Sequence, residues 1–285
     1  MPAHSLTPHP ALRPYIQNYL YFEVGETDQW ARVETSPTVL PVMAFSLESD
    51  ALQFREYGKF EPLTFGGQIT RFTRMHCWGR VKMFYIFFHP TGAYSLLGVP
   101  MKEMNNIFLS LSDLLGPQVR ELIERLQEQK SIMGVKQILE EFLLNCLACR
   151  KQKENAIHLS HTIEQLRIHS HQRNIIKSIC RNHGYSISRL ERHAREMIGI
   201  GPKMIQRIGR FHGVLNYINQ HLPPYKWAQI AFQFGYYDQM HFIKEFCWFY
   251  GTSPGELEKY SGKLNLSLNF TEEIDSPKSF LRVFK

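Results

Sequence analysis

Ten side chains near the C-terminus have the chemistry needed to contact nucleic-acid bases and phosphates. They lie in two segments with one shared layout. Ser186 and Asp238 are candidate helix caps, and in both segments a Gly follows the cap by 13 residues and a Pro by 16. The side chains in question are Ser188, Arg189, Glu191, Arg192 and Arg195 in the first segment, and Gln239, Met240, His241, Ile243 and Lys244 in the second.

These residue types match the hydrogen-bonding groups of base edges and of the DNA backbone. An Arg can fork onto guanine, Glu can accept from cytosine, Gln can pair with adenine, and Met or Ile can touch a thymine methyl group. Some of the arginines are expected to contact phosphate alone, and His241 to bond a phosphate or a neighbouring carbonyl. A solvated helix face explains any one of these residues, but it does not explain the apolar pair Met240 and Ile243 beside Gln and Lys.

The elements that must position these side chains are two helix-turn-helix units. Residues 175–181 and 227–234 are predicted as supporting helices, and Gly184 permits the positive φ that such a turn often needs. Leu190 and Met197 are expected to face inward in the first unit. The stripe Phe242, Phe246 and Phe249 has the same role in the second. Residues 203–219 are predicted to form one connecting helix, which would fix the distance between two reading helices placed about one DNA turn, roughly 34 Å, apart.

The charge of the chain is concentrated on the same region. The whole chain of 285 residues has a formal charge of +7, yet residues 1–170 contain 17 Lys and Arg and 17 Asp and Glu. Residues 171–260 contain 12 basic and 6 acidic residues. Charge alone would also fit a basic soluble surface, but together with the repeated pattern it indicates a polyanion partner.

Several other classes of protein are disfavoured. The five cysteines lie in apolar contexts and are expected to be buried free thiols. Cys146 and Cys149 form a C-x-x-C pair, but a zinc site would need two more ligands at a suitable spacing, so they too are expected to be buried free thiols. His76 and His89 lack the spacing of a metal set, so no metal or cofactor is expected. There is no secretory signal and no apolar run of about 20 residues, so we expect a cytoplasmic protein without a membrane span.

The N-terminal part has a different pattern, predicted as strands followed by helices. Residues 11–25 indicate an early strand, and residues 32–90 read as several short strands broken by turns, which implies a small barrel or sandwich. Thr91, Ser112 and Pro117 are expected at helix starts. An amphipathic helix from Gly134 either covers the sheet or pairs with its twin in a dimer. The predicted division is 1–150, 151–260 and a loosely held tail, 261–285.

The segment from Ile230 to Phe246, followed by Gly251 and Pro254, closely resembles the DNA-binding domain of the AraC/XylS family of bacterial transcription regulators. Residues 155–260 share this resemblance. The first unit departs from it at Ala194, where a bulky aromatic residue is usual, and at Gly201, where Ser or Thr is usual. Residues 12–16, 87–100 and 112–116 resemble an N-terminal domain of uncharacterised AraC-type regulators, which implies a small cupin-like β-barrel followed by helices.

This resemblance implies an α+β protein that acts as a transcription regulator, with double-stranded promoter or operator DNA as its partner. It also implies that the N-terminal part binds a small-molecule effector, forms a homodimer, or does both. RNA polymerase would be a further partner if the protein activates transcription. Residues 117–150 are the candidate dimer contact. The candidate effector-binding residues are Met43, Phe45, Phe65 and Tyr85, although plain core is the simpler interpretation of aromatic residues that line a small barrel.

Two alternatives belong to other functional classes. The N-terminal barrel could be an enzyme, but the sequence has no nucleophile elbow, phosphate loop or metal set, so we predict no enzymatic activity. A methyl-acceptor repair regulator would need a reactive thiol. Cys77, beside His76 and near Arg74 and Arg80, is the one candidate.

Overall fold

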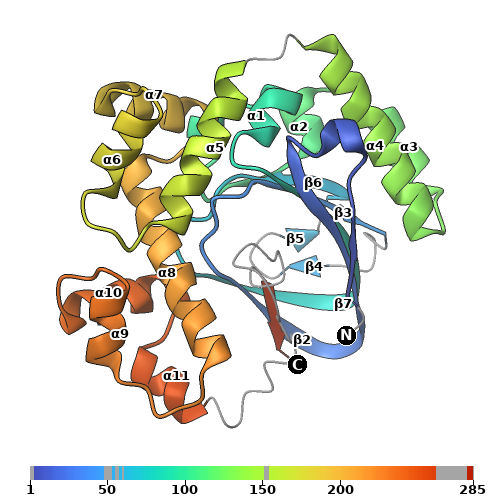
Figure 1. Cartoon of the computed structure of the whole chain (residues 1–285). Coiled ribbons are helices and arrows are strands. Elements are labelled where there is room, and N and C mark those ends of the chain that lie inside the picture. The colour runs from blue at the N-terminus through green and yellow to red at the C-terminus, as the bar shows by residue number, and fades with distance from the viewer. Residues whose placement is uncertain are drawn as a thin grey trace.

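An N-terminal sheet and a C-terminal group of helices make up the chain (Figure 1). The computed structural model describes residues 3–47, 53–54, 58–59, 61–150, 154–260 and 281–284. The strands are β1 (Ala3–Leu6), β2 (Ile16–Thr35), β3 (Val42–Ser46), β4 (Gln53–Phe54), β5 (Gly58–Lys59), β6 (Leu63–Gly66), β7 (Thr73–Phe88), β8 (Phe108–Ser110) and β9 (Leu281–Phe284). The predicted α+β class is confirmed.

The sheet is built around two long strands, β2 and β7, which pair in antiparallel fashion with Tyr21 opposite Phe84. The sequence predicted several short strands here. The difference arises because β2 continues through register shifts, one of them between Val24 and Thr27, where Gly25 lies. A bulge of this kind absorbs a glycine without ending the strand.

The main strand order is β1-β2-β7-β3-β6-β8. Strand β4 pairs with β5 and β7, and β9 pairs with β2. The predicted sheet is therefore present. The pairing of the described strands gives an order with two ends, β1 and β8, and does not show a closed barrel.

The two faces of the sheet are distinguished by the alternation of side chains along each strand. Tyr19, Phe84 and Ile86 face a hydrophobic core that also contains residues of the helices that follow β7. The next residues along, such as Phe22 and Phe87, are also buried but point to the opposite face. A strand buried on both faces reads as a nearly continuous apolar run, which explains residues 83–88 at the end of β7.

Four helices cover the first face of the sheet (Figure 1). They are α1 (Gly92–Leu97), α2 (Leu111–Leu115), α3 (Val119–Gln127) and α4 (Ile132–Cys149). The 3-10 helices η1 (Pro10–Leu12) and η3 (Met101–Glu103) contribute Leu12 and Met101 to the same core. Helix α4 buries Val135, Leu139 and Leu143 in this core, so covering the sheet is its observed role. Its pairing in a dimer stays a prediction.

The three predicted helix starts have different outcomes. Thr91 is at the N-cap position of α1, as expected. The Thr91 hydroxyl makes no capping bond and instead donates to the carbonyl of Ala156, 2.9 Å away. Ser110, not Ser112, caps α2, because its hydroxyl accepts from the N–H of Ser112. Pro117 lies before α3, whose cap position is Gln118.

The C-terminal helices form a second core. They are α5 (Glu154–Ile168), α6 (Ile175–Asn182), α7 (Ile187–Met197), α8 (Pro202–Gln220), α9 (Trp227–Gln233), α10 (Gln239–Tyr250) and α11 (Pro254–Tyr260). Val39 and Leu40, from the loop before β3, are buried in this same core. The two parts therefore share packed side chains across the predicted boundary near residue 150. Among the described helices, none combines the length and apolar character needed to cross a membrane.

The structure describes part of the predicted C-terminal tail and four of the five cysteine side chains. Residues 281–284 form β9 on the edge of β2, while 261–280 and 285 lie outside the described residues. Cys180 is buried as expected, but Cys146 and Cys247 are only half-buried, and Cys149 is exposed because it is the last residue of α4. The side chain of Cys77 lies outside the described residues, so the methyl-acceptor alternative is not examined by the structure.

The aromatic stripe of α10 provides a test of the second core. Phe246 is fully buried and its ring packs against those of Phe211, Phe242 and Tyr250. We expect Phe246→Ala to lower the free energy of unfolding by about 3–5 kcal/mol, because it leaves a cavity. Urea unfolding followed by circular dichroism measures the loss. Phe232→Ala is the matched control, because Phe232 is 78% exposed. Equal losses in the two variants would contradict the assignment.

Candidate nucleic-acid interface

The first unit consists of α6, a short turn and α7. Gly184 in the turn has φ +67°, the left-handed conformation that the sequence predicted. The Ser186 hydroxyl accepts a hydrogen bond from the N–H of Arg189 at 3.1 Å, so the predicted cap is confirmed. The bond satisfies one of the free donors at the start of a helix, and α7 therefore begins at a defined residue.

Helix α7 has one buried side and one exposed side. Leu190, Ala194 and Met197 are buried in the helical core. The predicted contact residues Ser188, Arg189, Arg192 and Arg195 are all exposed. This arrangement places a row of positive charge on the outer face of the helix.

Glu191 differs from the prediction that it lies free beside the arginines. It is half-buried, and its carboxylate pairs with the Arg195 guanidinium at 2.7 Å, one helical turn away. Gly201 makes room for this carboxylate, since a Cβ there would lie 2.5 Å from Glu191 Oε1. The departure of Gly201 from the family pattern thus has a local packing reason.

Three histidines and a tyrosine form a cluster of rings in contact with the first unit. His158 Nδ1 lies 3.1 Å from the Tyr185 hydroxyl, and the rings of His183 and His193 flank the same pair. Burial lowers the pKa of His193, and Arg189 and Arg192 lower it further. Burial likewise lowers the pKa of His183. Both imidazoles are therefore neutral at pH 7, and the positive charge of this unit comes from its arginines and Lys177.

The second unit consists of α9, a turn and α10. Gly235 in the turn has φ +73°, and a Cβ on it would collide with the backbone carbonyl of His171. No other residue type fits this position without strain. The Asp238 carboxylate accepts from the N–H of His241 at 2.7 Å, which confirms the predicted cap of α10.

The exposed side of α10 differs from the prediction at one residue. Gln239, Met240, His241 and Lys244 are exposed as expected, and Met240 is 61% exposed. Ile243, however, is half-buried and packs against the helical core. The apolar outward pair is thus reduced to Met240, because position 243 is adjacent to the buried Phe242 stripe.

Two exposed apolar residues beside the caps were missed by the sequence reasoning. Tyr237 is 91% exposed and Ile187 is 51% exposed. The turn of the second unit is one residue longer than that of the first, counted from the glycine to the cap, and Tyr237 is the additional residue. This difference in turn length was the signal that could have identified it.

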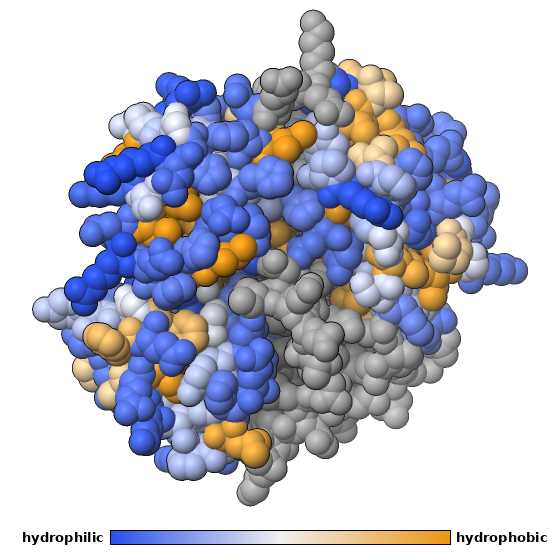
Figure 2. Space-filling model, in the orientation of Figure 1, coloured by the Kyte–Doolittle hydropathy of each residue, from blue (hydrophilic) through white to orange (hydrophobic). Residues whose placement is uncertain are grey.

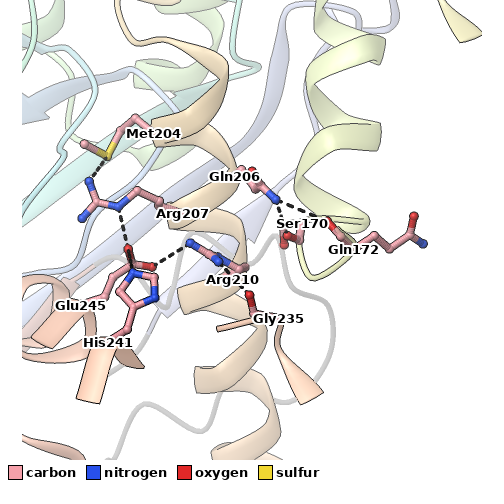
Figure 3. A network of polar contacts seen from close by, with 9 residues as sticks. All are labelled: Ser170, Gln172, Met204, Gln206, Arg207, Arg210, Gly235, His241 and Glu245. Carbon is pink, nitrogen blue, oxygen red and sulfur yellow. Dashed lines mark hydrogen bonds and ion pairs between the residues drawn. The ribbon is translucent and has the colours of Figure 1, made fainter. Parts of the chain in front are cut away.

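Helix α8 connects the two units as one continuous element, as predicted, and it holds α10 through a buried carboxylate (Figure 3). Glu245 of α10 is nearly inaccessible, and its carboxylate accepts from Arg207 Nε at 2.6 Å and from Arg210 Nη2 at 3.4 Å. Arg210 also donates to the carbonyl of Gly235 at 3.0 Å. Arg210 of α8 is thereby bonded to both the turn and α10.

Helix α8 is also hydrogen-bonded to the loop that precedes α6. Gln206 Nε2 donates to the carbonyls of Ser170 and Gln172 (Figure 3). A Cβ at Gly209 would come within 3.0 Å of Ser170 and of the Arg167 carbonyl, so the helix and this loop are in close contact. The connector is therefore bonded to the second unit and to the loop that precedes the first unit.

Figure 2 shows one face of the molecule, with strongly hydrophilic side chains projecting from its helical part and apolar residues scattered singly there. No group of three or more His, Cys, Asp and Glu side chains arranged to hold a metal ion occurs within the residues that the structure describes.

The candidate effector residues do not come together. Met43, Phe45 and Phe65 are fully buried and face the core formed with α1–α4. Tyr85 points to the opposite face of the sheet, where its ring stacks on Phe22 at 5.5 Å. The prediction of one shared site is wrong, because these residues do not all have the same position in the alternation along paired strands.

Glu245→Gln tests the buried carboxylate. The change removes the negative charge but keeps the shape, and it leaves two arginines without their partner. We expect the free energy of unfolding to fall by about 3 kcal/mol, the usual cost of breaking a buried ion pair from one side. Urea unfolding measures the effect. Glu124→Gln, on the exposed face of α3, is the control. A change as small as that of the control would show that the pair contributes no stability.

Comparisons with known proteins give a partial match. Residues 4–110 match the model of a domain of unknown function (DUF6597). No curated protein matches the chain. A crystal structure of ToxT from Vibrio cholerae is similar with a TM-score of 0.42 and 12% identity, covering 85% of this chain and 96% of that chain. Unsaturated fatty acid bound wild-type ToxT from Vibrio cholerae is similar with a TM-score of 0.40 and 10% identity, covering 84% and 94%.

Proposed function

We propose that this chain is a sequence-specific DNA-binding transcription regulator of the AraC/XylS type. The observation that carries the proposal is the repeated unit itself. Two helices, α7 and α10, each begin at a side-chain cap after a glycine turn, and one continuous helix, α8, joins them. A helix that follows such a turn is the element that enters the major groove. The exposed residues on both helices fit base edges and phosphates.

The charge distribution supports the same function. The basic excess of residues 171–260 falls on the segment that contains both units. The exposed Arg189 and Arg192 on α7 and Lys244 on α10 belong to this excess. Basic groups of this kind release counterions when they neutralise phosphates, which gives affinity without sequence preference. The base contacts then select the site.

The N-terminal lobe is proposed to sense a small molecule on the second face of its sheet, and this revises the candidate residues. Phe22, Met83, Tyr85 and Phe87 share that face. The buried Ser46 hydroxyl, paired in register with Met83, has no hydrogen-bond partner in the part of the chain that the structure describes. An apolar effector with one hydrogen-bonding group would fit these side chains. Dimerisation through residues 117–150 and contact with RNA polymerase belong to the same proposal.

Selection of bound sequences from a random duplex pool tests the function. Full-length protein at about 150 mM salt is the sample, because salt screens weak non-specific binding. We expect a motif of two short blocks whose centres lie about one helical turn apart. One block alone would mean that a single unit reads bases. No enrichment, with or without residues 1–150, would contradict the proposal.

Single substitutions assign the contacts. Arg192→Ala and Lys244→Ala are each expected to weaken binding, and any residue that reads a base will also relax preference at one position by about 1–3 kcal/mol. Fluorescence anisotropy on the selected duplex and on its single-base variants separates the two effects. Arg120→Ala is the control, because it removes one exposed positive charge from α3. Affinities of both variants equal to that of the control would show that the reading faces are assigned wrongly.

A further inference from the structure

The connection between β6 and β7 lies between the ends of the two reading helices. It consists of Gln68–Phe72, and it is joined to Asn105 and Asn106 of the loop after η3. We call these residues together the strap. The strap belongs to the N-terminal lobe, yet it makes hydrogen bonds to the C-terminal ends of both α7 and α10.

The contact with the first unit is made at the residue where α7 has ended. Asn105 Nδ2 donates to the carbonyl of Gly199 at 2.6 Å. The approach is close on every side, since a Cβ on Gly199 would collide with the Met101 carbonyl and lie 3.0 Å from Gln68 Oε1. Nearby, the Tyr94 hydroxyl donates to Glu196 of α7 at 3.3 Å.

The contact with the second unit is made through Trp248 in the last turn of α10. Its indole N–H donates to the carbonyl of Thr70 at 3.2 Å, and its own carbonyl accepts from the N–H of Phe72 at 3.2 Å. The Phe72 ring lies against Gly251, the residue that ends α10, where a Cβ would come within 2.6 Å of it. Backbone and side chain of Trp248 are thus both held by the strap.

Hydrogen bonds within the strap connect these two contacts. Asn106 Oδ1 accepts from the Thr70 N–H at 2.9 Å, and Asn106 Nδ2 lies 2.9 Å from the Thr70 hydroxyl. The Asn106 N–H donates to the carbonyl of Gln68 at 2.8 Å. A continuous path of bonded neighbours therefore runs from Gly199 through the strap to Trp248.

The connector α8 does not fix α7 in the same way as it fixes α10. Helix α10 is bonded to α8 through Glu245, whereas α7 is joined to it by a short segment that contains Gly199 and Gly201. Glycines leave a backbone free to rotate unless other contacts hold it. The bond from Asn105 to the Gly199 carbonyl supplies such a contact.

We propose that the strap sets the separation of the two reading helices, so that the protein accepts one spacing between its two DNA blocks. The proposal rests on the proposed function. Inserting one base pair moves a block by about 3.4 Å along the duplex and turns it by about a tenth of a helical turn. A rigid pair of helices cannot follow this movement. A pair released from the strap can follow it more readily, because the segment after α7 then keeps only its packing in the helical core and loses the bond that ties the Gly199 carbonyl to the N-terminal lobe.

The test measures spacing preference in three variants of the full-length chain. Trp248→Phe removes the indole donor, Asn105→Ala removes the bond to Gly199, and Asn106→Ala removes the bonds to Thr70. Asn145→Ala, at an exposed position of α4, is the matched control. Affinity is measured on duplexes with the two selected blocks at the preferred spacing, with one or two base pairs added or removed, and with one block alone.

Wild type and control are expected to bind at least about tenfold more weakly when the spacing changes by one base pair, a difference of about 1.4 kcal/mol. In the three variants we expect this ratio to fall to about threefold or less, with binding to a single block unchanged. Loss of binding to the single block as well would mean that the substitutions damage the units themselves, and it would overturn the proposal.

Two further outcomes are distinguishable. Unaltered spacing preference in all three variants would overturn the role of the strap while leaving the DNA-binding function in place, and so would a wild type that tolerates every spacing. If the wild type binds no duplex at all, the proposed function is contradicted. The proposed role of the strap, which rests on that function, is then contradicted as well. Trp248→Phe preserves an aromatic ring at that position, so its folded state is checked by circular dichroism before binding is measured.

Discussion

The geometry of the helical lobe depends on one buried carboxylate. Glu245 lies on the reading helix of the second unit, almost without access to solvent, and both of its arginine partners belong to α8. A buried charge is costly unless it is paired and hydrogen-bonded. The carboxylate therefore excludes arrangements in which α10 rotates away from α8. Because Arg210 also holds the Gly235 carbonyl, the turn and the helix after it are fixed by the same side chain.

Local features of the two units could be predicted from the sequence, whereas the contacts that fix them in space could not. Ser186 and Asp238 were identified as caps because capping involves residues only three positions apart. The partners of Glu245 lie 35 and 38 residues away. Glu245 lies three residues after Phe242 and four before Phe249, beside the apolar stripe, but its partners depend on how α8 crosses α10.

The sheet shows the same limit in another form. Apolar strands were recognised, yet Met43 and Tyr85 were assigned to one site although they face opposite sides. The face to which a side chain points depends on register and on what covers each side, and a strand buried on both sides gives no alternation to read. Bulges add to the difficulty, since β2 continues through several register shifts, and the residue pattern does not show that the strand goes on beyond them.

The position of the strap gives the N-terminal lobe a mechanical connection to the reading helices. Its residues Gln68–Phe72 directly join β6 to β7, and β7 contributes Met83 and Phe87 to the face proposed for the effector. A ligand that shifts these strands moves the ends of the strap, and packed interiors transmit such a shift because they are close-packed and hardly compressible. The strap contacts α7 and α10 at their C-terminal ends and leaves their exposed N-terminal residues open. An effector acting through it would therefore change the separation of α7 and α10 without covering the side chains that are proposed to contact bases.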